Sequence, residues 1–278
     1  MLKQRIITAL ILAPLMIGGI FFLPSQEFGY FIALIAVLGA WEWANMSGFA
    51  AQPARLGFAG AMAAILAGVA YGLTQEVTMA ILTAGAAWWL LALLLVVRYP
   101  KQTAFWSPKV VRLFIGLLVL VPMWVGFVVL KAQNHSALLI LYLMFVVWGA
   151  DTGAYFAGKQ FGKAKLAPQV SPGKSWAGFW GGLATTMLVA AVFVYYIEHN
   201  IQSLSTEAIG QLVLITLLTA LVSVLGDLLE SMFKRYCGIK DSSALLPGHG
   251  GILDRIDSMT AAVPVFALLL LVFNWSLA

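Results

Sequence analysis

The sequence predicts an all-α polytopic integral membrane protein with about nine transmembrane helices. Of its 278 residues, 62% are hydrophobic and only 10% are charged, whereas soluble domains carry about 25% charged residues. The mean hydropathy is +0.95, and the apolar stretches reach the length of about 20 residues that a helix needs to cross a bilayer. These stretches lie near residues 6–23, 28–47, 54–73, 77–97, 111–130, 136–157, 177–197, 209–230 and 260–277.

The basic residues predict the orientation of these helices. All of the 16 lysines and arginines except Lys131 fall on one side of the predicted membrane, while Glu27, Glu76, Glu198 and Glu207 lie on the other side. Cytoplasmic loops are enriched in Lys and Arg, so we expect a cytoplasmic N-terminus and, after nine crossings, a periplasmic C-terminus. The net charge of +5 therefore indicates a membrane face and not a nucleic-acid partner.

The unusual polar residues are concentrated in the second half of the chain. Residues 1–135 read as apolar helices with short loops that support the rest, face lipid or form a dimer contact, whereas residues 136–278 read as catalytic helices. Within the latter, the polar residues gather in two stretches, 148–182 and 226–257. No low-complexity linker separates the halves, so we expect one integral-membrane domain covering 1–278.

Residues 226–257 hold the densest group of charges in this apolar chain. If the first part is helical, the spacing of Asp227, Glu230, Ser231 and Lys234 places all four on one face. A charge inside a membrane helix costs at least about 2.5–3.5 kcal/mol, which the alternative of a solvated loop with ordinary charges does not explain. Carboxylates that converge with a hydroxyl and a lysine suit both a hard divalent cation and a phosphate.

Two further carboxylates, Asp254 and Asp257, follow a His-Gly-Gly turn and point the same way from a second helical turn. With Asp227 they offer hard oxygen ligands for Mg²⁺, in a site for one ion or for two, the second of which can be divalent or monovalent. No second histidine lies near His249, so we expect it to position the loop or to contact a phosphate.

The stretch 148–182 predicts a second set of substrate contacts. Asp151 and Tyr155 are one turn apart at a helix end, just ahead of several lysines. Lysines there often complement the helix dipole or contact anionic lipid, but the acid one turn inside favours a pocket wall that faces a phosphate-bearing substrate.

The segment S-P-G-K-S-W-A-G-F-W-G-G, residues 171–182, leads into the next helix. Backbone N–H groups at a helix start, with Lys174 and Ser175 beside them, can bind an anion, although the segment is not a Walker A motif. Its later glycines alternatively indicate close helix packing, and both readings can hold together.

Glu42 is a further acid within a predicted membrane helix. It lies near the cytoplasmic end of that helix, so we expect a structural role in which it pairs with a base on a neighbouring helix or with a lipid headgroup.

The 226–257 stretch resembles the signature of phosphatidate cytidylyltransferases, also called CDP-diacylglycerol synthases, of the proteobacterial inner-membrane type. The pattern S-x-x-K-R-x-x-x-x-K-D is followed by P-G-H-G-G-I-L-D-R-I-D, and residues 171–178 resemble a second family motif, with Ala177 where an acid or amide is common. The signature is carried by Ser231, Lys234, Arg235, Lys240, Asp241, Pro247, His249, Gly250, Gly251, Asp254, Arg255 and Asp257.

The resemblance implies the reaction CTP + phosphatidate → CDP-diacylglycerol + pyrophosphate, in phospholipid synthesis at the cytoplasmic membrane face, and a homodimer. With the residue patterns it predicts catalytic roles for Asp227, Ser231, Lys234, Asp254 and Asp257, of which the three aspartates bind metal. It also predicts substrate contacts by Asp151, Tyr155, Lys174, Ser175, Arg235, Lys240, Asp241, His249, Gly250, Gly251 and Arg255.

Two other functions remain compatible with parts of the pattern. A CTP-dependent polyprenol or diacylglycerol kinase shares fragments of the motifs but not their full spacing. A secondary transporter predicts acids near mid-membrane and inverted repeats, whereas these acids lie at helix ends. The sequence shows no Ser/His/Asp or Cys/His nucleophile arrangement, which favours direct in-line displacement.

Overall fold

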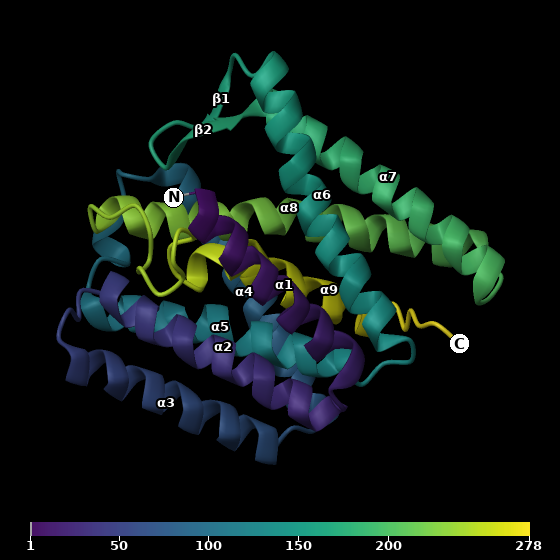
Figure 1. Cartoon of the computed structure of the whole chain (residues 1–278), viewed down its shortest axis with the longest axis horizontal. Coiled ribbons are helices and arrows are strands. Elements are labelled where there is room, and N and C mark those ends of the chain that lie inside the picture. Colours follow the sequence, from purple (N-terminus) through teal and green to yellow (C-terminus); the bar gives the residue numbers. More distant parts are fainter. Residues whose placement is uncertain (1) are drawn as a thin grey trace.

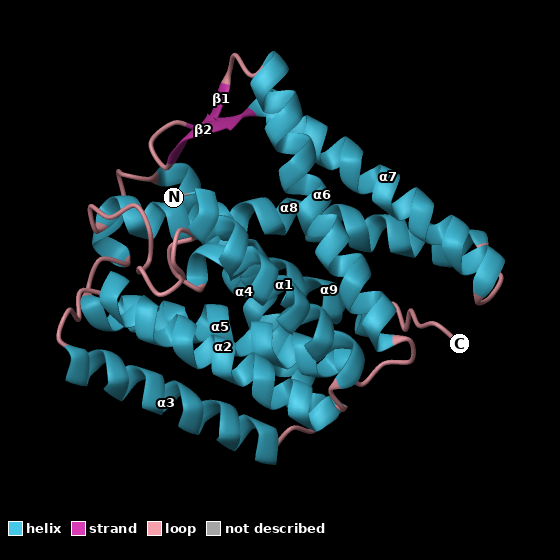
Figure 2. Cartoon of the chain, viewed as in Figure 1, coloured by secondary structure: helices cyan, strands magenta, loops and turns pink. Residues whose placement is uncertain are grey.

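The computed structural model describes residues 2–278, which form a bundle of α-helices with one 3-10 turn and one small antiparallel hairpin (Figures 1 and 2). The elements in chain order are α1 Leu2–Phe22, α2 Ser25–Met46, α3 Gln52–Tyr71, α4 Gln75–Arg98, η1 Thr103–Phe105, α5 Lys109–Lys131, α6 Ser136–Phe161, β1 Lys165–Ala167, β2 Ser171–Ser175, α7 Trp176–Asn200, α8 Thr206–Tyr236 and α9 Leu253–Val272.

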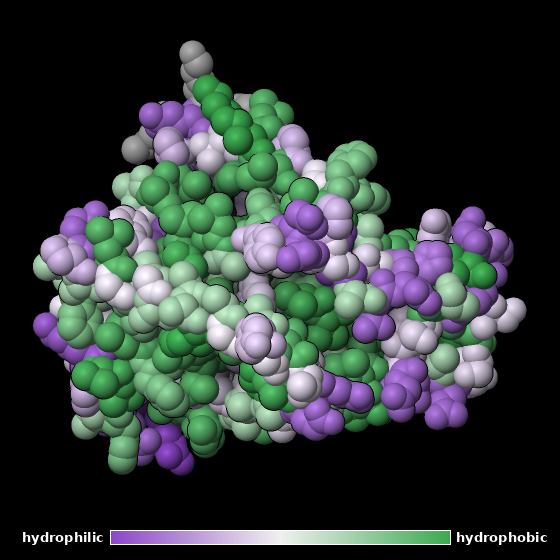
Figure 3. All heavy atoms as spheres, turned by 90° about the horizontal axis from the view of Figure 1, so that it is seen from below, coloured by the Kyte–Doolittle hydropathy of each residue, from purple (hydrophilic) through white to green (hydrophobic). Residues whose placement is uncertain are grey.

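Eight of the helices in residues 2–278, α2 to α9, are long and apolar enough to cross a membrane. In α1 the apolar stretch is shorter, Leu10–Phe22. Large apolar side chains are also exposed along the bundle, among them Leu90 at 71% and Val97 at 72%. Figure 3 shows a broad apolar face, with polar side chains gathered most densely towards the end where α7 meets α8. The chain is an all-α polytopic membrane protein, as the sequence predicts.

Two predicted boundaries were wrong in a way that affects the site. The last helix begins at Leu253 and not near 260, so Asp254 and Asp257 lie in its first turns. The preceding helix continues to Tyr236, so Lys234 is helical as well. The charges at these helix ends hid the helical continuation, because hydropathy alone marks only the apolar part. The hairpin was also missed, since its strands are short and the second one contains Pro172.

Helix α9 occupies the centre of the bundle and joins the two halves of the chain. It packs against α8 and also against α4 and α5 from the first half. Close approach is possible at Gly85 of α4, where a Cβ would stand 2.7 Å from Pro122, and at Gly126 of α5, where it would stand 2.8 Å from Val263. The first helices therefore form the surface against which the apolar middle of α9 packs.

The end of the bundle that carries the hairpin is tied together by polar contacts to backbone carbonyls. Trp43 Nε1 donates to Arg112 O at 2.7 Å, and Arg112 Nη1 donates to Met46 O at 2.8 Å. Cys237 Sγ donates to the same Met46 carbonyl at 2.8 Å. These bonds connect α2, α5 and the end of α8. In Figure 1 the N-terminus lies towards this end, and the C-terminus lies at the opposite one.

Helices α6 and α7 pack backbone against backbone, which positions the hairpin between them. A Cβ on Gly178 would stand 2.8 Å from Ala154 O, and one on Gly182 would stand 2.6 Å from Ala150 O. The packing interpretation of these glycines is confirmed. Their contact holds the start of α7, and with it β2, against α6.

We predict that Gly182→Ala destabilises the fold, because its Cβ meets rigid backbone of α6. Overpacking of this kind costs about 1–3 kcal/mol. Gly210→Ala in α8 is the matched control, since a Cβ there meets nothing within 4 Å, and alanine is the better helix former. Thermal unfolding of the two variants in detergent measures the difference, and equal melting temperatures would contradict the packing argument.

Candidate active site

Lys234 lies between two carboxylates at the junction of α8 and α9. Its Nζ donates to Asp254 Oδ1 at 2.6 Å and lies 3.2 Å from Glu230 Oε1. Only 10% of the lysine side chain is exposed, with 4% of Glu230 and 5% of Asp254. Taking charges out of water is expensive unless partners replace the water, so this cation is required by the two acids around it.

Asp254 is held from several directions. Besides Lys234, its Oδ2 accepts hydrogen bonds from Gly251 N at 2.7 Å, Ser242 N at 2.9 Å and Ser242 Oγ at 3.0 Å. Backbone N–H donors at both ends of the 242–251 loop thus converge on one carboxylate. This arrangement fixes the loop to the first turn of α9.

The His-Gly-Gly turn closes this loop. Leu246 N donates to Gly250 O at 2.8 Å, and His249 N donates to Leu246 O at 2.9 Å. Gly250 has a φ of +83°, a conformation that favours glycine, and a Cβ there would also meet Asp241 and Asp254. His249 Nδ1 is buried and has no hydrogen-bond partner among the described residues. Of the predicted residues, His249 and Gly250 belong to this turn, Gly251 follows it directly, and Asp241 lies against Gly250.

A second ion pair connects the hairpin to α8. Lys174 Nζ in β2 lies 2.7 Å from Asp227 Oδ2, and Ser231 Oγ donates to Asp227 Oδ1 at 3.1 Å. Asp151 of α6 lies close enough for its charge to act on Lys174 and Asp227. The hairpin, α6 and α8 thus meet in one cluster.

Asp257 completes the cluster from α9. Its carboxyl interacts electrostatically with Asp227, which repels it, and with Lys174 and Lys234, which attract it. The only hydrogen bond described for the carboxyl comes from the neighbouring Ser258 N, at 2.7 Å. The two helices approach closely here because Gly226, next to Asp227, packs against the Asp257 backbone.

The donor set fits Mg²⁺ bound with the help of a substrate. Within residues 2–278 no three His, Cys, Asp or Glu side chains lie together as a complete metal site. Mg²⁺ is, however, usually held by one or two carboxylates together with substrate phosphates and water. Asp227 and Asp257 match that requirement better than Asp254, whose oxygens already accept four hydrogen bonds.

Several predicted contact residues have other partners. Ser175 is buried, and its Oγ accepts from Gly178 N at 3.1 Å, which caps α7. Arg235 Nε donates to Val170 O at 3.3 Å and so joins α8 to the hairpin turn. Tyr155 is exposed on α6, with Lys159 Nζ 5.9 Å from its ring centroid. Lys240 and Arg255 are exposed near the cluster. Substrate contact by these residues stays a prediction.

The partner that the sequence predicts for Glu42 was wrong, although its role is structural as predicted. We expected a basic or lipid partner, but its fully buried carboxylate instead binds the 242–253 segment. Glu42 and Ser242 are 200 residues apart along the chain, so no local sequence pattern could predict that they meet. The one available clue was a carboxylate in an apolar helix with no base at helical spacing.

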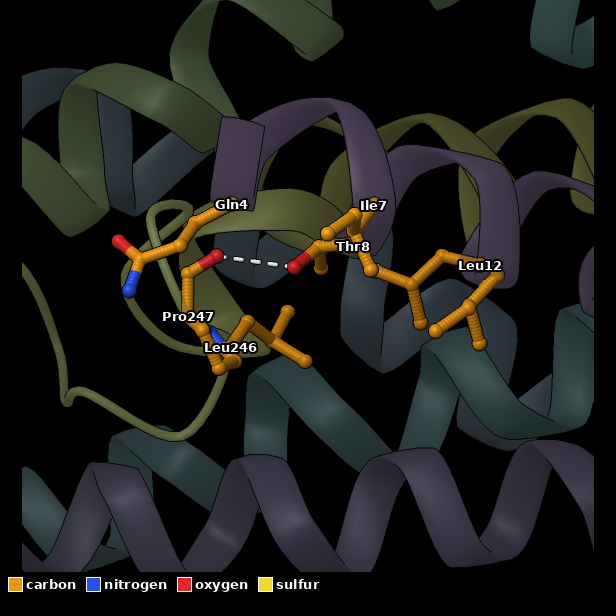
Figure 4. Close-up of a pocket in the computed structure, with 7 residues that line it drawn as sticks. Gln4, Ile7, Thr8, Leu12, Leu246 and Pro247 are labelled. Atoms are coloured by element: carbon orange, nitrogen blue, oxygen red, sulfur yellow. Dashed lines mark hydrogen bonds between the residues drawn. The ribbon is translucent and has the colours of Figure 1, made fainter. Parts of the chain in front are cut away.

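An apolar groove of about 310 Å³ lies beside the His-Gly-Gly turn. Figure 4 shows α1 side chains facing the loop across it, with Thr8 Oγ1 donating to Pro247 O at 2.8 Å. Its lining residues are Gln4, Ile7, Thr8, Ile11, Leu12, Leu246 and Pro247. The groove thus borders the same loop that holds Asp254.

Comparison with known proteins shows the family of this chain. Residues 3–273 match the cytidylyltransferase family. The chain belongs to this family. A phosphatidate cytidylyltransferase of Pseudomonas aeruginosa is 48% identical over 275 residues, which cover 99% of each chain. One of Haemophilus influenzae is 39% identical and covers 96% of this chain and 98% of its own. One of Staphylococcus haemolyticus is 43% identical over 148 residues, about half of each chain.

We predict that Lys234→Met lowers the free energy of unfolding by about 3–5 kcal/mol, because it leaves two buried carboxylates without their cation. Adding Glu230→Gln to Lys234→Met should recover part of this loss, since one of the unpaired charges is then gone. Lys165→Met, at an exposed lysine of β1, serves as the control. Denaturant unfolding in micelles measures all three, and additive effects of the two changes would contradict the shared-cation arrangement.

Proposed function

We propose that this chain transfers a cytidylyl group from CTP to phosphatidate, giving CDP-diacylglycerol and pyrophosphate, at the cytoplasmic face of a bacterial inner membrane. The observation that carries the proposal is the meeting of Lys174, Asp227, Lys234, Asp254 and Asp257 at one end of a membrane-spanning bundle. The names of full-length relatives supply the substrates.

Lys174 is suited to bind the triphosphate of CTP. It is 24% exposed and is held by a single ion pair to Asp227, so a phosphate can replace that partner at small cost. Lys234 is more buried and keeps Asp254 in place. Exposed Arg235, Lys240 and Arg255 around the cluster offer further positive charge to a phosphate-rich pair of substrates.

Mg²⁺ would be held by Asp227 and Asp257 together with the triphosphate. When bound, the ion would offset phosphate charge and relieve the repulsion between the two aspartates. Metal titration of the purified protein counts the ions bound. The role of Asp254 in this arrangement is to fix the turn and to orient Lys234.

The nucleophilic side chains near the cluster are unsuited to form a covalent intermediate. Ser231 donates its hydroxyl proton to Asp227, which is itself paired with a lysine. Ser242 is hydrogen-bonded to carboxylates. Burial raises the pKa of the Cys237 thiol, against the opposing effect of the Arg112 guanidinium. None of these groups has the adjacent free base that activates a nucleophile.

Direct displacement is therefore the mechanism that we propose. A phosphate oxygen of phosphatidate attacks the α-phosphorus of CTP and forms the new P–O bond. The bond from that phosphorus to the oxygen bridging to the β-phosphate breaks, and pyrophosphate leaves with the electron pair. The protein positions both phosphates in line and neutralises their charge.

The apolar groove beside the turn provides room for part of an acyl chain. It lies between α1 and Leu246–Pro247, next to the loop that carries the cluster. A lipid whose phosphate sits in the cluster can thus keep its hydrocarbon in contact with apolar side chains. The homodimer expected from the family resemblance stays a prediction.

Product analysis tests the proposal. Detergent-purified protein is given CTP and Mg²⁺, with and without phosphatidate, and lipid and nucleotide products are separated. We expect CDP-diacylglycerol and pyrophosphate only when both substrates are present, and no turnover in EDTA. Release of CDP with a newly phosphorylated lipid would instead establish a CTP-dependent kinase, and inactivity of folded protein with every lipid phosphate would contradict both.

We predict opposite stability effects for two substitutions that both abolish turnover. Asp257→Asn removes a charge that Asp227 repels, so unfolding should become no easier while activity falls below about 1%. Asp254→Asn removes the closer of the two carboxylates around Lys234 and weakens the acceptor of the Ser242 and Gly251 N–H groups, so activity and stability should fall together. Activity assays and melting temperatures of both variants check this, and near-normal turnover in Asp257→Asn would refute its metal role.

A further inference from the structure

Glu42 is the most deeply buried acid for which the reaction gives no role. It lies in α2, in the half of the chain that carries no signature residue, and its relative exposure is 0%. Its carboxylate nevertheless reaches the segment that precedes Asp254. Such a charge persists only when its surroundings supply hydrogen-bond donors in place of water.

Four donors surround this carboxylate, two at each oxygen. Oε1 accepts from Ser243 Oγ at 2.6 Å and from Ile252 N at 2.9 Å. Oε2 accepts from Leu253 N at 2.8 Å and lies 3.0 Å from Ser242 Oγ, whose single proton is shared with Asp254 Oδ2. The two N–H groups belong to the start of α9, where backbone donors lack helical partners and the helix dipole favours a negative charge.

The same contacts extend to Asp254. Ser242 Oγ lies 3.0 Å from Glu42 Oε2 and also 3.0 Å from Asp254 Oδ2. Gly251 N donates to Asp254, and a Cβ on Gly251 would stand 2.6 Å from each Glu42 oxygen. The carboxylate of Glu42 is therefore packed directly under the turn that holds Asp254.

No partner other than the loop accounts for the buried charge of Glu42. Arg55 contributes only a longer-range attraction, because its guanidinium lies 3.4 Å from the centroid of the Trp41 ring. Zero exposure excludes a lipid headgroup. If the position needed only to fill space, an apolar side chain would serve at lower cost, whereas a carboxylate also fixes the direction of four donors.

We propose that Glu42 is a positioning residue of the active site, which holds the start of α9 and the 242–251 loop so that Asp254 and Asp257 keep their places. The kinetic part of this inference rests on the proposed function, but the contact itself does not. The N-terminal helices are then more than support, since α2 supplies the anchor of the signature loop.

Glu42→Gln tests the anchor with almost no change of volume. Each Glu42 oxygen accepts one hydrogen bond from a serine hydroxyl and one from a backbone N–H. In the variant, an NH₂ group replaces one of these oxygens. The serine hydroxyl can turn and accept from the new NH₂, but the backbone N–H at Ile252 or Leu253 is left facing a donor. Amide hydrogen exchange in a peptide covering residues 248–256 should quicken by roughly tenfold or more.

Kinetics separate positioning from a general loss of structure. In Glu42→Gln we expect kcat to fall by about 10- to 100-fold, while KM for CTP changes by less than about threefold because Lys174 is untouched. The rate of amide hydrogen exchange in α6 and α7 should stay the same as in the unsubstituted protein. Glu27→Gln, at an exposed acid near the other end of α2, should leave exchange and kcat unaltered.

Two results would overturn the proposal: unchanged exchange at residues 248–256, or unchanged kcat with faster exchange. If Glu42→Gln fails to fold, Ser243→Ala removes one donor from Oε1 and should give the same pattern with a smaller effect, and no effect there would equally contradict the anchor. If the unchanged protein makes no CDP-diacylglycerol, the proposed function fails, and exchange alone decides whether Glu42 holds the loop.

Discussion

The charged end of this membrane protein depends on one buried lysine shared by two acids. Lys234 on α8 neutralises Glu230 of its own helix and Asp254 of α9, so the two helices that carry the signature cannot be placed independently. Beside the Lys234–Asp254 pair, Glu42 hydrogen-bonds the start of α9, and the ion pair of Lys174 with Asp227 joins the hairpin to α8. Two lysines thus offset part of the negative charge. Asp227 and Asp257 still repel each other, and they are the aspartates that we propose to bind a metal ion with the phosphates of a nucleotide.

Burial divides the cluster into a fixed part and an exchangeable part. Lys234 and Asp254 are almost completely enclosed, and their contacts to the loop are made by backbone as well as side chains, which suits a framework. Lys174 and Asp227 are each about one quarter exposed, so their ion pair is weak enough to open when phosphates compete for it. Catalysis of phosphoryl chemistry consists largely of positioning and charge compensation. Under the proposed function, this division assigns one group of residues to each task.

Much of this arrangement could be predicted from the sequence, for identifiable reasons. Long apolar stretches separated by basic loops specify the helices, and helical spacing alone places Asp227, Ser231 and Lys234 on one face. Hydropathy marks only the apolar part of a helix, so the predicted membrane spans stopped short of the charged turns of α8 and α9, although the spacing of the charged residues in those turns is helical. The pairing of Lys234 with Asp254, and the capping of α9 by Glu42, depend on how helices pack across the bundle. No periodicity within a single helix contains that information.

The stereochemical course at the α-phosphorus tests the central claim most directly, namely that the cluster aligns two phosphates without forming a covalent intermediate. CTP made chiral at the α-phosphorus by sulfur substitution is converted with phosphatidate, and the configuration of the nucleotide lipid is determined. A single in-line displacement predicts inversion. Retention would require two displacements through a side chain of the protein, and would contradict the roles assigned here to Ser231, Ser242 and Cys237.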